Sequence, residues 1–120
     1  MLIWGRLSLA IAVEIERAGA ATIVKLAGRL DGPAAPALDQ ELVPLVVPGA
    51  RLVLDMTDLA YVSSAGLRIF LKTSKQAKAV KASLSLFGIN DIVQEVFDIS
   101  GFTAIFAIHG SRDEALAALR

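Results

Sequence analysis

Hydrophobic and polar residues alternate in two short runs near the start of the chain. In residues 9–17, Val13 and Ile15 are separated by glutamates, and an alternation of this period is typical of a half-buried β-strand. Residues 21–27 form a second run, rich in β-branched side chains, and a short segment containing Gly19 separates it from the first. The two runs therefore predict an antiparallel hairpin.

A helical period follows the hairpin. Leucines recur at helical spacing over residues 34–47, Asp31 stands where it could cap the helix, and Pro33 suits a first turn. Because a proline inside a helix removes a main-chain hydrogen bond, Pro44 predicts that this helix ends or kinks near Leu42–Val43.

Strand-like and helical patterns then alternate to the end of the chain. They predict strands at 51–55, 83–87 and 104–108, a connecting loop over 56–62, and helices over 65–79, from Asn90 or Asp91 to Gly101, and from Ser111 onward. The packed face of the helix before Gly101 is expected to contain Ile92, Val93, Val96 and Phe97. This order predicts a single α/β domain over residues 1–120, with a mixed β-sheet that opens on the hairpin and about four helices.

The first residues are apolar enough to suggest a targeting segment. The apolar stretch has no basic region ahead of it, Arg6 interrupts it, and it reaches Glu14 without the length of about 20 residues that a membrane helix needs. We therefore expect no membrane insertion and interpret residues 1–8 as a lead-in to the first strand.

Composition narrows the class of protein. Of the 120 residues, 55% are hydrophobic and 20% are charged, which is typical of a globular domain. The 12 basic and 12 acidic residues cancel, whereas nucleic-acid binding needs a basic surface, so we expect no direct nucleic-acid contact. The chain has no cysteine, which excludes disulfides and a cysteine nucleophile and is compatible with the cytoplasm.

The common catalytic motifs are missing. Neither a G-x-x-x-x-G-K-[ST] phosphate loop nor a G-x-G-x-x-G fingerprint occurs, and His109 is the single histidine. A catalytic triad could be imagined from Ser64, His109 and an aspartate, but the G-x-S-x-G pattern is absent. Asp55 and Asp58 have no third ligand in view and are interpreted as loop caps. We therefore expect a protein that is not an enzyme and that holds no metal and no cofactor.

Two serines stand where the helix over 65–79 is expected to begin. The free N–H groups and the positive dipole end of a helix start favour an anion, so the fold would tolerate a phosphate on either hydroxyl. The same phosphate, with about −1.5 to −2 charges, would disrupt a docking surface that faces carboxylates or apolar groups. The simpler alternative is that Ser63 or Ser64 is only a helix cap, worth about 1 kcal/mol.

The segment Val62–Leu67 (VSSAGL) resembles the signature of STAS domains, notably those of the anti-sigma factor antagonists. Other segments resemble elements of the same family in the same order: Leu26–Asp31 an early G-x-L-D element, Val53–Leu59 the central strand and loop, and Phe97–Phe102 the late helix end. The resemblance covers residues 10–119 and implies the STAS fold.

The resemblance implies a switch controlled by phosphorylation. In the family, a partner that is both anti-sigma factor and serine kinase phosphorylates a serine two positions before the glycine, which is Ser64 here. The unphosphorylated antagonist binds the anti-sigma factor and so regulates sigma-factor-dependent transcription; phosphorylation breaks the complex and a phosphatase restores it. Family members often have an aspartate where this chain has Ser63, which leaves Ser63 as an alternative acceptor, and some have a second hydroxyl where it has Ala65.

The expected partner-binding surface surrounds Ser64. Asp31 matches a family aspartate in a region implicated in partner contact, but it could equally be a helix cap. A basic stripe of Arg68, Lys72, Lys75 and Lys78 could contact an acidic partner or be a solvated face. The candidate contact residues are Asp31, Asp58, Tyr61, Val62, Ser63, Ser64, Ala65, Gly66, Arg68 and Lys72.

Other functions stay open. A STAS subunit of a lipid transporter or of a signalling scaffold would share the fold and need no phosphorylation. A domain that binds a nucleotide or another small ligand through the loop before Ser64 is a second alternative, and an unrelated α/β enzyme is a third. The sequence also leaves open whether the protein forms a homodimer.

Overall fold

The hairpin predicted at the start of the chain is present. The computed structural model describes residues 11–119, in which β1 (Ile11–Ala18) and β2 (Ala21–Leu30) pair antiparallel in continuous register around a two-residue turn. The lead-in predicted over residues 1–8 lies outside the described residues.

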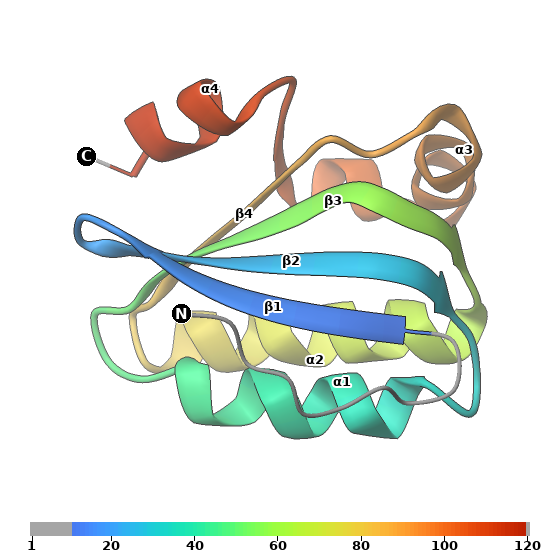
Figure 1. Ribbon diagram of the computed structural model, residues 1–120, viewed down its shortest axis with the longest axis horizontal. Coiled ribbons are helices and arrows are strands. Elements are labelled where there is room, and N and C mark those ends of the chain that lie inside the picture. Colours follow the sequence, from blue (N-terminus) through green and yellow to red (C-terminus); the bar gives the residue numbers. More distant parts are fainter. Residues whose placement is uncertain (1–10, 120) are drawn as a thin grey trace.

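Three more strands extend the sheet. β3 (Arg51–Val62) pairs with β2, β4 (Ser83–Phe87) with β3, and β5 (Ala107–His109) with β4, all of them parallel. The strands therefore follow one another across the sheet in chain order (Figure 1). One antiparallel pair next to parallel pairs is the mixed α/β sheet that the order of elements predicted.

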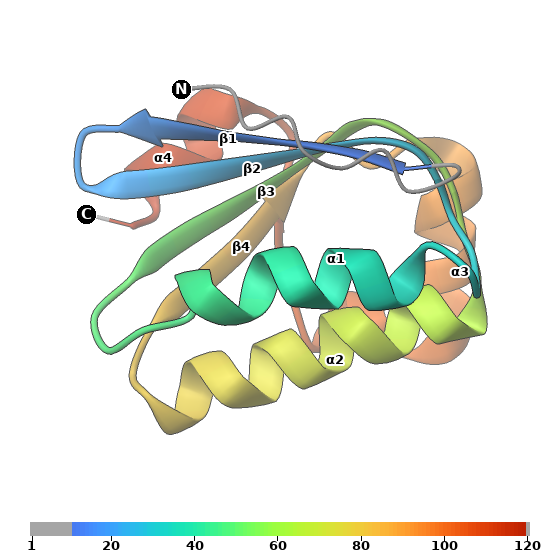
Figure 2. The ribbon, with the colours of Figure 1, turned by 60° about the horizontal axis from the view of Figure 1, so that its bottom comes forward.

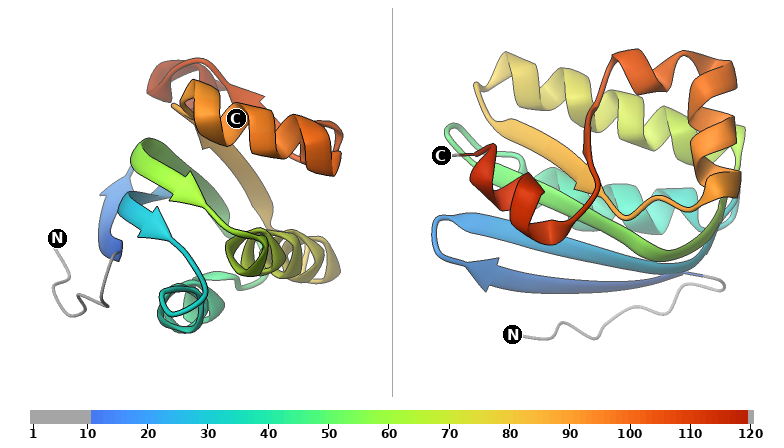
Figure 3. Two further views of the ribbon diagram at one scale, coloured as in Figure 1. Left: turned by 90° about the vertical axis from the view of Figure 1, so that its right-hand side faces the viewer. Right: turned by 90° about the horizontal axis from the view of Figure 1, so that it is seen from above.

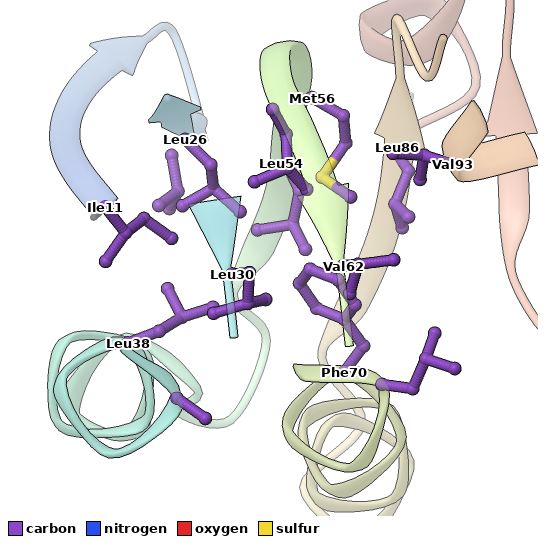
Figure 4. Packing of buried hydrophobic residues seen from close by; sticks show 14 of the residues in the cluster. Ile11, Leu26, Leu30, Leu38, Leu54, Met56, Val62, Phe70, Leu86 and Val93 are labelled. Atoms are coloured by element: carbon purple, nitrogen blue, oxygen red, sulfur yellow. The ribbon is translucent and has the colours of Figure 1, made fainter. Parts of the chain in front are cut away.

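The helices cover the two faces of the sheet unequally. α1 (Ala35–Leu42) and α2 (Ser64–Ala79) lie side by side on one face, whereas α4 (Arg112–Ala117) lies on the other (Figures 1 and 2). α3 (Asp91–Ser100) packs against β3. The main core lies between the sheet and α1, α2 and α3 and includes Leu30, Leu54, Met56 and Phe70, all of them fully buried (Figure 4).

A smaller core lies under α4. Successive side chains of a strand point to opposite faces, so Val53 faces α4 while its neighbour Leu54 faces the main core. The buried members of this second cluster are Ile23, Val53, Phe87 and Ala115, and Leu116 and Leu119 pack against them.

The capping residues predicted for α3 and α4 are present in the structure. Asn90 Oδ1 accepts the Val93 N–H at 2.8 Å and Ser111 Oγ accepts the Glu114 N–H at 3.2 Å, so Asn90 and Ser111 are N-caps. Gly101 ends α3 with φ of 77°, a left-handed conformation that glycine adopts without strain.

The first helix begins later than predicted and ends at the predicted place. α1 starts at Ala35, with Pro36 rather than Pro33 in its first turn. It ends at Leu42, and Pro44 lies in the 3₁₀ turn that follows. The proline thus limits the length of α1, because its ring cannot be accommodated in a continuing α-helix.

The loop predicted over 56–62 is wrong, because β3 continues through these residues. The pairing of β3 with β2 contains two bulges, at each of which β3 has one residue more than the β2 segment opposite it. The first lies between Asp55 and Asp58 and the second between Leu59 and Tyr61. Each bulge shifts the phase of the strand, so buried side chains recur at every third position instead of every second. These buried residues are Met56, Leu59 and Val62.

Two predictions near the C-terminal end are also wrong. The last strand is β5 and not residues 104–108. The segment before it begins with a 3₁₀ turn at Phe102–Ala104. The ring centres of Phe102 and Phe106 lie 5.6 Å apart there, and the Phe97 ring packs against both. Ile92 does not pack with the buried face of α3; it is 60% exposed.

Candidate functional site

Ser63 joins β3 to α2 and is the N-cap of the helix. Its Oγ accepts the Gly66 N–H at 3.3 Å, and its carbonyl accepts the Leu67 N–H at 2.9 Å. The Ser63 N–H donates to the Leu30 carbonyl, the last residue of β2, at 2.8 Å. These bonds attach the start of α2 to the carboxyl ends of β2 and β3, the end of the molecule that faces the viewer in the left panel of Figure 3.

Ser64 is the first residue of α2 and is exposed. Since Ser63 is the cap, Ser64 is free of that role, and within the described part of the chain no hydrogen bond engages its hydroxyl. The two serines predicted at the helix start therefore differ: Ser63 holds the helix, and Ser64 presents its hydroxyl to solvent.

Gly66 lets α2 approach the sheet closely. A β-carbon at Gly66 would lie 2.7 Å from Leu30 Cγ and 2.9 Å from Val62 Cγ2, and both of those side chains are buried. Atoms of this kind do not approach so closely in proteins, so any larger residue would push α2 away from β2 and β3. The glycine of the VSSAGL segment therefore has a packing role that fixes where Ser64 lies.

β2 and β3 extend past the rest of the sheet beside these serines. β4 pairs with β3 only as far as Asp55, and beyond that point β3 continues to pair with β2. At the end of this ribbon the Arg29 guanidinium lies over the Tyr61 ring, 4.4 Å from its centre. Such cation–π contacts hold a charged group against an aromatic face. The site thus includes Arg29, which no pattern in the sequence indicated.

Asn90 supports the outer edge of the extended part of β3. Its Nδ2 donates to the Leu59 carbonyl at 2.9 Å while its Oδ1 caps α3. The Asn90 side chain therefore provides hydrogen-bond partners for a carbonyl at the edge of β3 and for an N–H at the start of α3. It thereby links α3 to the segment that leads into Ser63.

Two aspartates of the candidate surface already have partners in the fold. Asp31 Oδ1 accepts the Ala34 N–H at 3.2 Å in the turn before α1, so the capping role considered for Asp31 is present. Asp58 forms an ion pair with Lys25 at 3.3 Å, and this hydrogen-bonded carboxylate raises the pKa of Lys25. Both aspartates keep exposed surface, Asp31 less than Asp58.

The outer face of α2 is basic. It carries Arg68, Lys72, Lys75 and Lys78, all exposed, and α2 contains no acidic residue. Lys72 reaches α1, where its Nζ lies 2.8 Å from Asp39 Oδ2. The other three have no ion pair within residues 11–119. A positive surface therefore begins one turn after Ser64 and runs along the helix.

The structure brings most of the predicted contact residues together at the ends of β2 and β3 and the start of α2. Tyr61, Ser63 and Ala65 are half-buried, whereas Val62 and Gly66 are buried. Val62 and Gly66 therefore position the serines and do not themselves offer surface.

The sequence also raised Asp55 and His109 as residues with possible chemistry. Asp55 accepts both the N–H and the hydroxyl of Thr57, at 3.0 and 2.6 Å, so it stabilises the first bulge of β3. Within the described residues no three His, Cys, Asp or Glu side chains gather closely enough to hold a metal ion. His109 lies at the end of β5, where no described residue hydrogen-bonds its buried Nε2.

A surface hollow of about 320 Å³ lies away from the serines, between β1, β2 and α4. Its charged lining includes Glu16 and Arg112, which pair with each other at 2.6 Å. The Arg112 guanidinium lowers the pKa of Glu16 below its ordinary value. No helix between residues 11 and 119 has the length and apolar character to cross a membrane.

Sequence comparison identifies the family. The STAS domain profile matches residues 12–115, which run from the second residue of β1 into α4. The chain belongs to the STAS domain family.

Two relatives carry more specific names. The candidate anti-sigma factor antagonist BtrV of Bordetella bronchiseptica is 42% identical over 99 residues, which cover 82% of this chain and 85% of that protein. The anti-sigma-B factor antagonist of Bacillus subtilis is 38% identical over 85 residues, covering 71% of this chain and 78% of that protein.

Solved structures share the fold. An anti-sigma factor antagonist from Mycobacterium paratuberculosis superimposes with a TM-score of 0.84 at 24% identity, covering 92% of this chain and 95% of the other. The antagonist SpoIIAA gives a TM-score of 0.76 in its unphosphorylated form, at 20% identity and with 91% and 96% coverage. Its phosphorylated form from Bacillus gives 0.68, at 19% identity and with 91% and 100% coverage.

Proposed function

We propose that this protein is an anti-sigma factor antagonist that binds an anti-sigma factor with serine kinase activity and releases it when Ser64 is phosphorylated. The observation that carries the proposal is the division of roles at the start of α2. Ser63 caps the helix, so Ser64 stands exposed at its first position with no structural duty. A group added to Ser64 changes the surface without removing a bond that holds the fold.

The fold can accommodate the added charge. A phosphoserine carries about −1.5 to −2 charges near neutral pH. At the first position of a helix the dipole and the free N–H groups attract an anion, and α2 has no acidic residue to repel it. The folded state should therefore persist after phosphorylation, as expected of a switch that acts on binding.

In this reaction Ser64 is a substrate of the kinase. Its Oγ attacks the γ-phosphorus of a nucleoside triphosphate held by the partner, the bond to the diphosphate leaving group breaks, and the hydroxyl proton passes to a base of the kinase. A phosphatase returns the hydroxyl by hydrolysing the phosphate ester with water. No group of this chain acts as a catalyst in either step, which agrees with a protein that is not an enzyme.

The partner would dock over Ser64 and the basic face of α2. Ala60 and Arg68, which flank Ser64 in the sequence, are exposed, and Tyr61 and Ala65 are partly accessible; Asp58, earlier on β3, is also exposed. Because α2 carries four positive and no negative residues, the surface that meets it should be acidic. A phosphate placed between the two would repel the partner's carboxylates and would lose its hydration in the interface, and both effects favour release.

The names of the relatives support this proposal, and SpoIIAA has been solved with and without its phosphate in the same fold. An antagonist of this kind acts in the cytoplasm, where its binding to the anti-sigma factor frees the sigma factor. It needs neither direct nucleic-acid contact nor membrane insertion.

Binding measurements with Ser64 variants test the proposal. We expect the anti-sigma factor kinase of the source organism to bind the wild type and Ser64→Ala alike, and to bind Ser64→Asp about tenfold or more weakly, because the added carboxylate imitates part of the phosphate charge. Arg51→Ala is the control, because Arg51 is exposed at the opposite end of β3. Equal binding of the wild type and Ser64→Asp would refute the proposal.

Kinase mapping tests the choice of acceptor. Incubation with the kinase and ATP should add one phosphate, located on Ser64 by peptide mass spectrometry, and Ser64→Ala should remain unmodified. Phosphate found on Ser63 would contradict the proposal, because that hydroxyl caps α2.

A STAS subunit of a transporter or signalling scaffold is the second candidate. One observation favours it: Ser63 replaces the aspartate that often precedes the acceptor in anti-sigma factor antagonists. This candidate would be supported if the Ser64→Asp variant bound the partner as well as the wild type does and if the kinase left the wild type unmodified.

A further inference from the structure

Arg68 lies on the same side of α2 as Ser64. The two residues are four positions apart, which places them one turn from each other on a helix, and both are exposed. Helical side chains lean toward the N-terminus of their helix, so the long side chain of Arg68 can reach the turn that begins with Ser64.

The Arg68 guanidinium is available for a new contact. Within residues 11–119 it forms no ion pair, whereas Lys72, one turn further along, is held by Asp39 at 2.8 Å. The N–H groups of Ser64 and Ala65, at the first two helical positions, also have no acceptor inside the helix. A group with several acceptor oxygens at Ser64 would meet both kinds of donor.

We propose that Arg68 is the intramolecular receptor of the phosphate on Ser64, so that phosphorylation both adds negative charge and withdraws this arginine from the partner. The inference rests on the proposed phosphorylation of Ser64. A guanidinium matches a phosphate particularly well, because two parallel N–H groups can bond two oxygens at once. Without the phosphate, the same guanidinium is free to face the acidic surface of the partner.

Other charged groups at this end of the molecule are already engaged. On β2, Arg29 lies over Tyr61, and Asp31, in the turn before α1, accepts the Ala34 N–H. On β3, Asp58 pairs with Lys25. Arg68 is therefore the basic residue near Ser64 with no competing contact among the described residues.

Phosphate titration tests this receptor role. Phosphoserine is installed at position 64 by genetic code expansion, so the measurement does not depend on any kinase, and the phosphate is titrated by ³¹P NMR in the folded full chain. We compare the wild type, Arg68→Ala and Lys78→Ala, where Lys78 is a matched loss of one positive charge near the far end of α2.

The expected result is a second phosphate pKa lower by about 0.3 to 0.5 units in the wild type and in Lys78→Ala than in Arg68→Ala, because an adjacent cation favours the dianion. Arg68→Lys, which keeps the charge but loses the paired donors, should fall between them. The same pKa in Arg68→Ala and in the wild type, or equal shifts in both alanine variants, would overturn the inference.

The two proposals fail separately. If the pKa depends on Arg68 but the phosphorylated protein still binds its partner, the receptor exists and the proposed function is wrong. If phosphorylation abolishes binding but the pKa does not depend on Arg68, the proposed function stands and the receptor does not.

Discussion

The main-chain N–H of Ser63 donates a 2.8 Å hydrogen bond to the carbonyl of Leu30, so the residue before α2 is attached to the last residue of β2. This bond continues the pairing of two parallel strands to the place where the helix begins. Ser64 follows immediately, and its own side chain takes no part in holding the start of the helix.

The fit of Gly66 against Leu30 predicts a destabilised Gly66→Ala variant. Alanine favours a helix over glycine by about 1 kcal/mol, but its methyl group would lie 2.7 Å from Leu30 Cγ inside the core. We expect overpacking to exceed that gain and to lower the free energy of unfolding by about 1–2 kcal/mol, measured by urea denaturation. Gly32→Ala is the control, because a β-carbon there meets no atom within 4 Å. A Gly66→Ala variant as stable as the wild type would show that α2 can shift without cost.

Asn90 is predicted to contribute more than an ordinary helix cap. Asn90→Ala removes both the acceptor for the Val93 N–H and the donor to the Leu59 carbonyl, and we expect a loss of about 1–3 kcal/mol in thermal or urea unfolding. Asn90→Asp keeps the cap but places a carboxylate against the Leu59 carbonyl, so it should recover only part of that loss. Full recovery in Asn90→Asp would mean that the bond to Leu59 adds no stability.

Asp31 can be tested for its two roles with a pair of variants. Asp31→Ala removes the acceptor for the Ala34 N–H and should lower stability by about 0.5–1 kcal/mol. Asp31→Asn keeps an acceptor oxygen and should unfold close to the wild type. If Asp31→Asn were as unstable as Asp31→Ala, the negative charge and not the hydrogen bond would be what stabilises the turn before α1.

The ion pair between Glu16 and Arg112 predicts a pH-dependent contribution to stability. Arg112 lowers the pKa of Glu16 in the folded protein, so the contribution is present above the ordinary pKa of a glutamate and is lost as the pH falls through the lowered value. The difference in melting temperature between the wild type and Glu16→Gln should be small, because the pair is exposed, and should vanish in acid. A difference that grew as the pH fell would contradict this assignment.

The parts of the fold predicted correctly are those specified by local chemistry. Ser111, Asn90 and Gly101 act at helix ends through their own side chains or backbone freedom, so their roles are visible in sequence. The extension of β3 was missed because its bulges are set by pairing with β2, which changes the alternation that a strand would otherwise show.

In the site, too, features set by local chemistry were predicted and features set by contacts between distant segments were missed. The position of Ser64 at a helix start follows from the sequence, but which of the two serines caps the helix depends on the main chain of Ser63. The contact of Arg29 with Tyr61 joins residues on different strands across a bulged register, and no local pattern announces it. The close approach at Gly66 likewise depends on Leu30, which lies far earlier in the chain.

The most direct test of the proposed switch uses protein carrying phosphoserine at position 64 and follows two quantities in the same preparation: the dissociation constant for the anti-sigma factor kinase and the melting temperature. Unmodified protein provides the reference for both. We predict that affinity falls about tenfold or more while the melting temperature changes by no more than a few degrees. Undiminished affinity would contradict the switch, and so would unfolding caused by the phosphate itself.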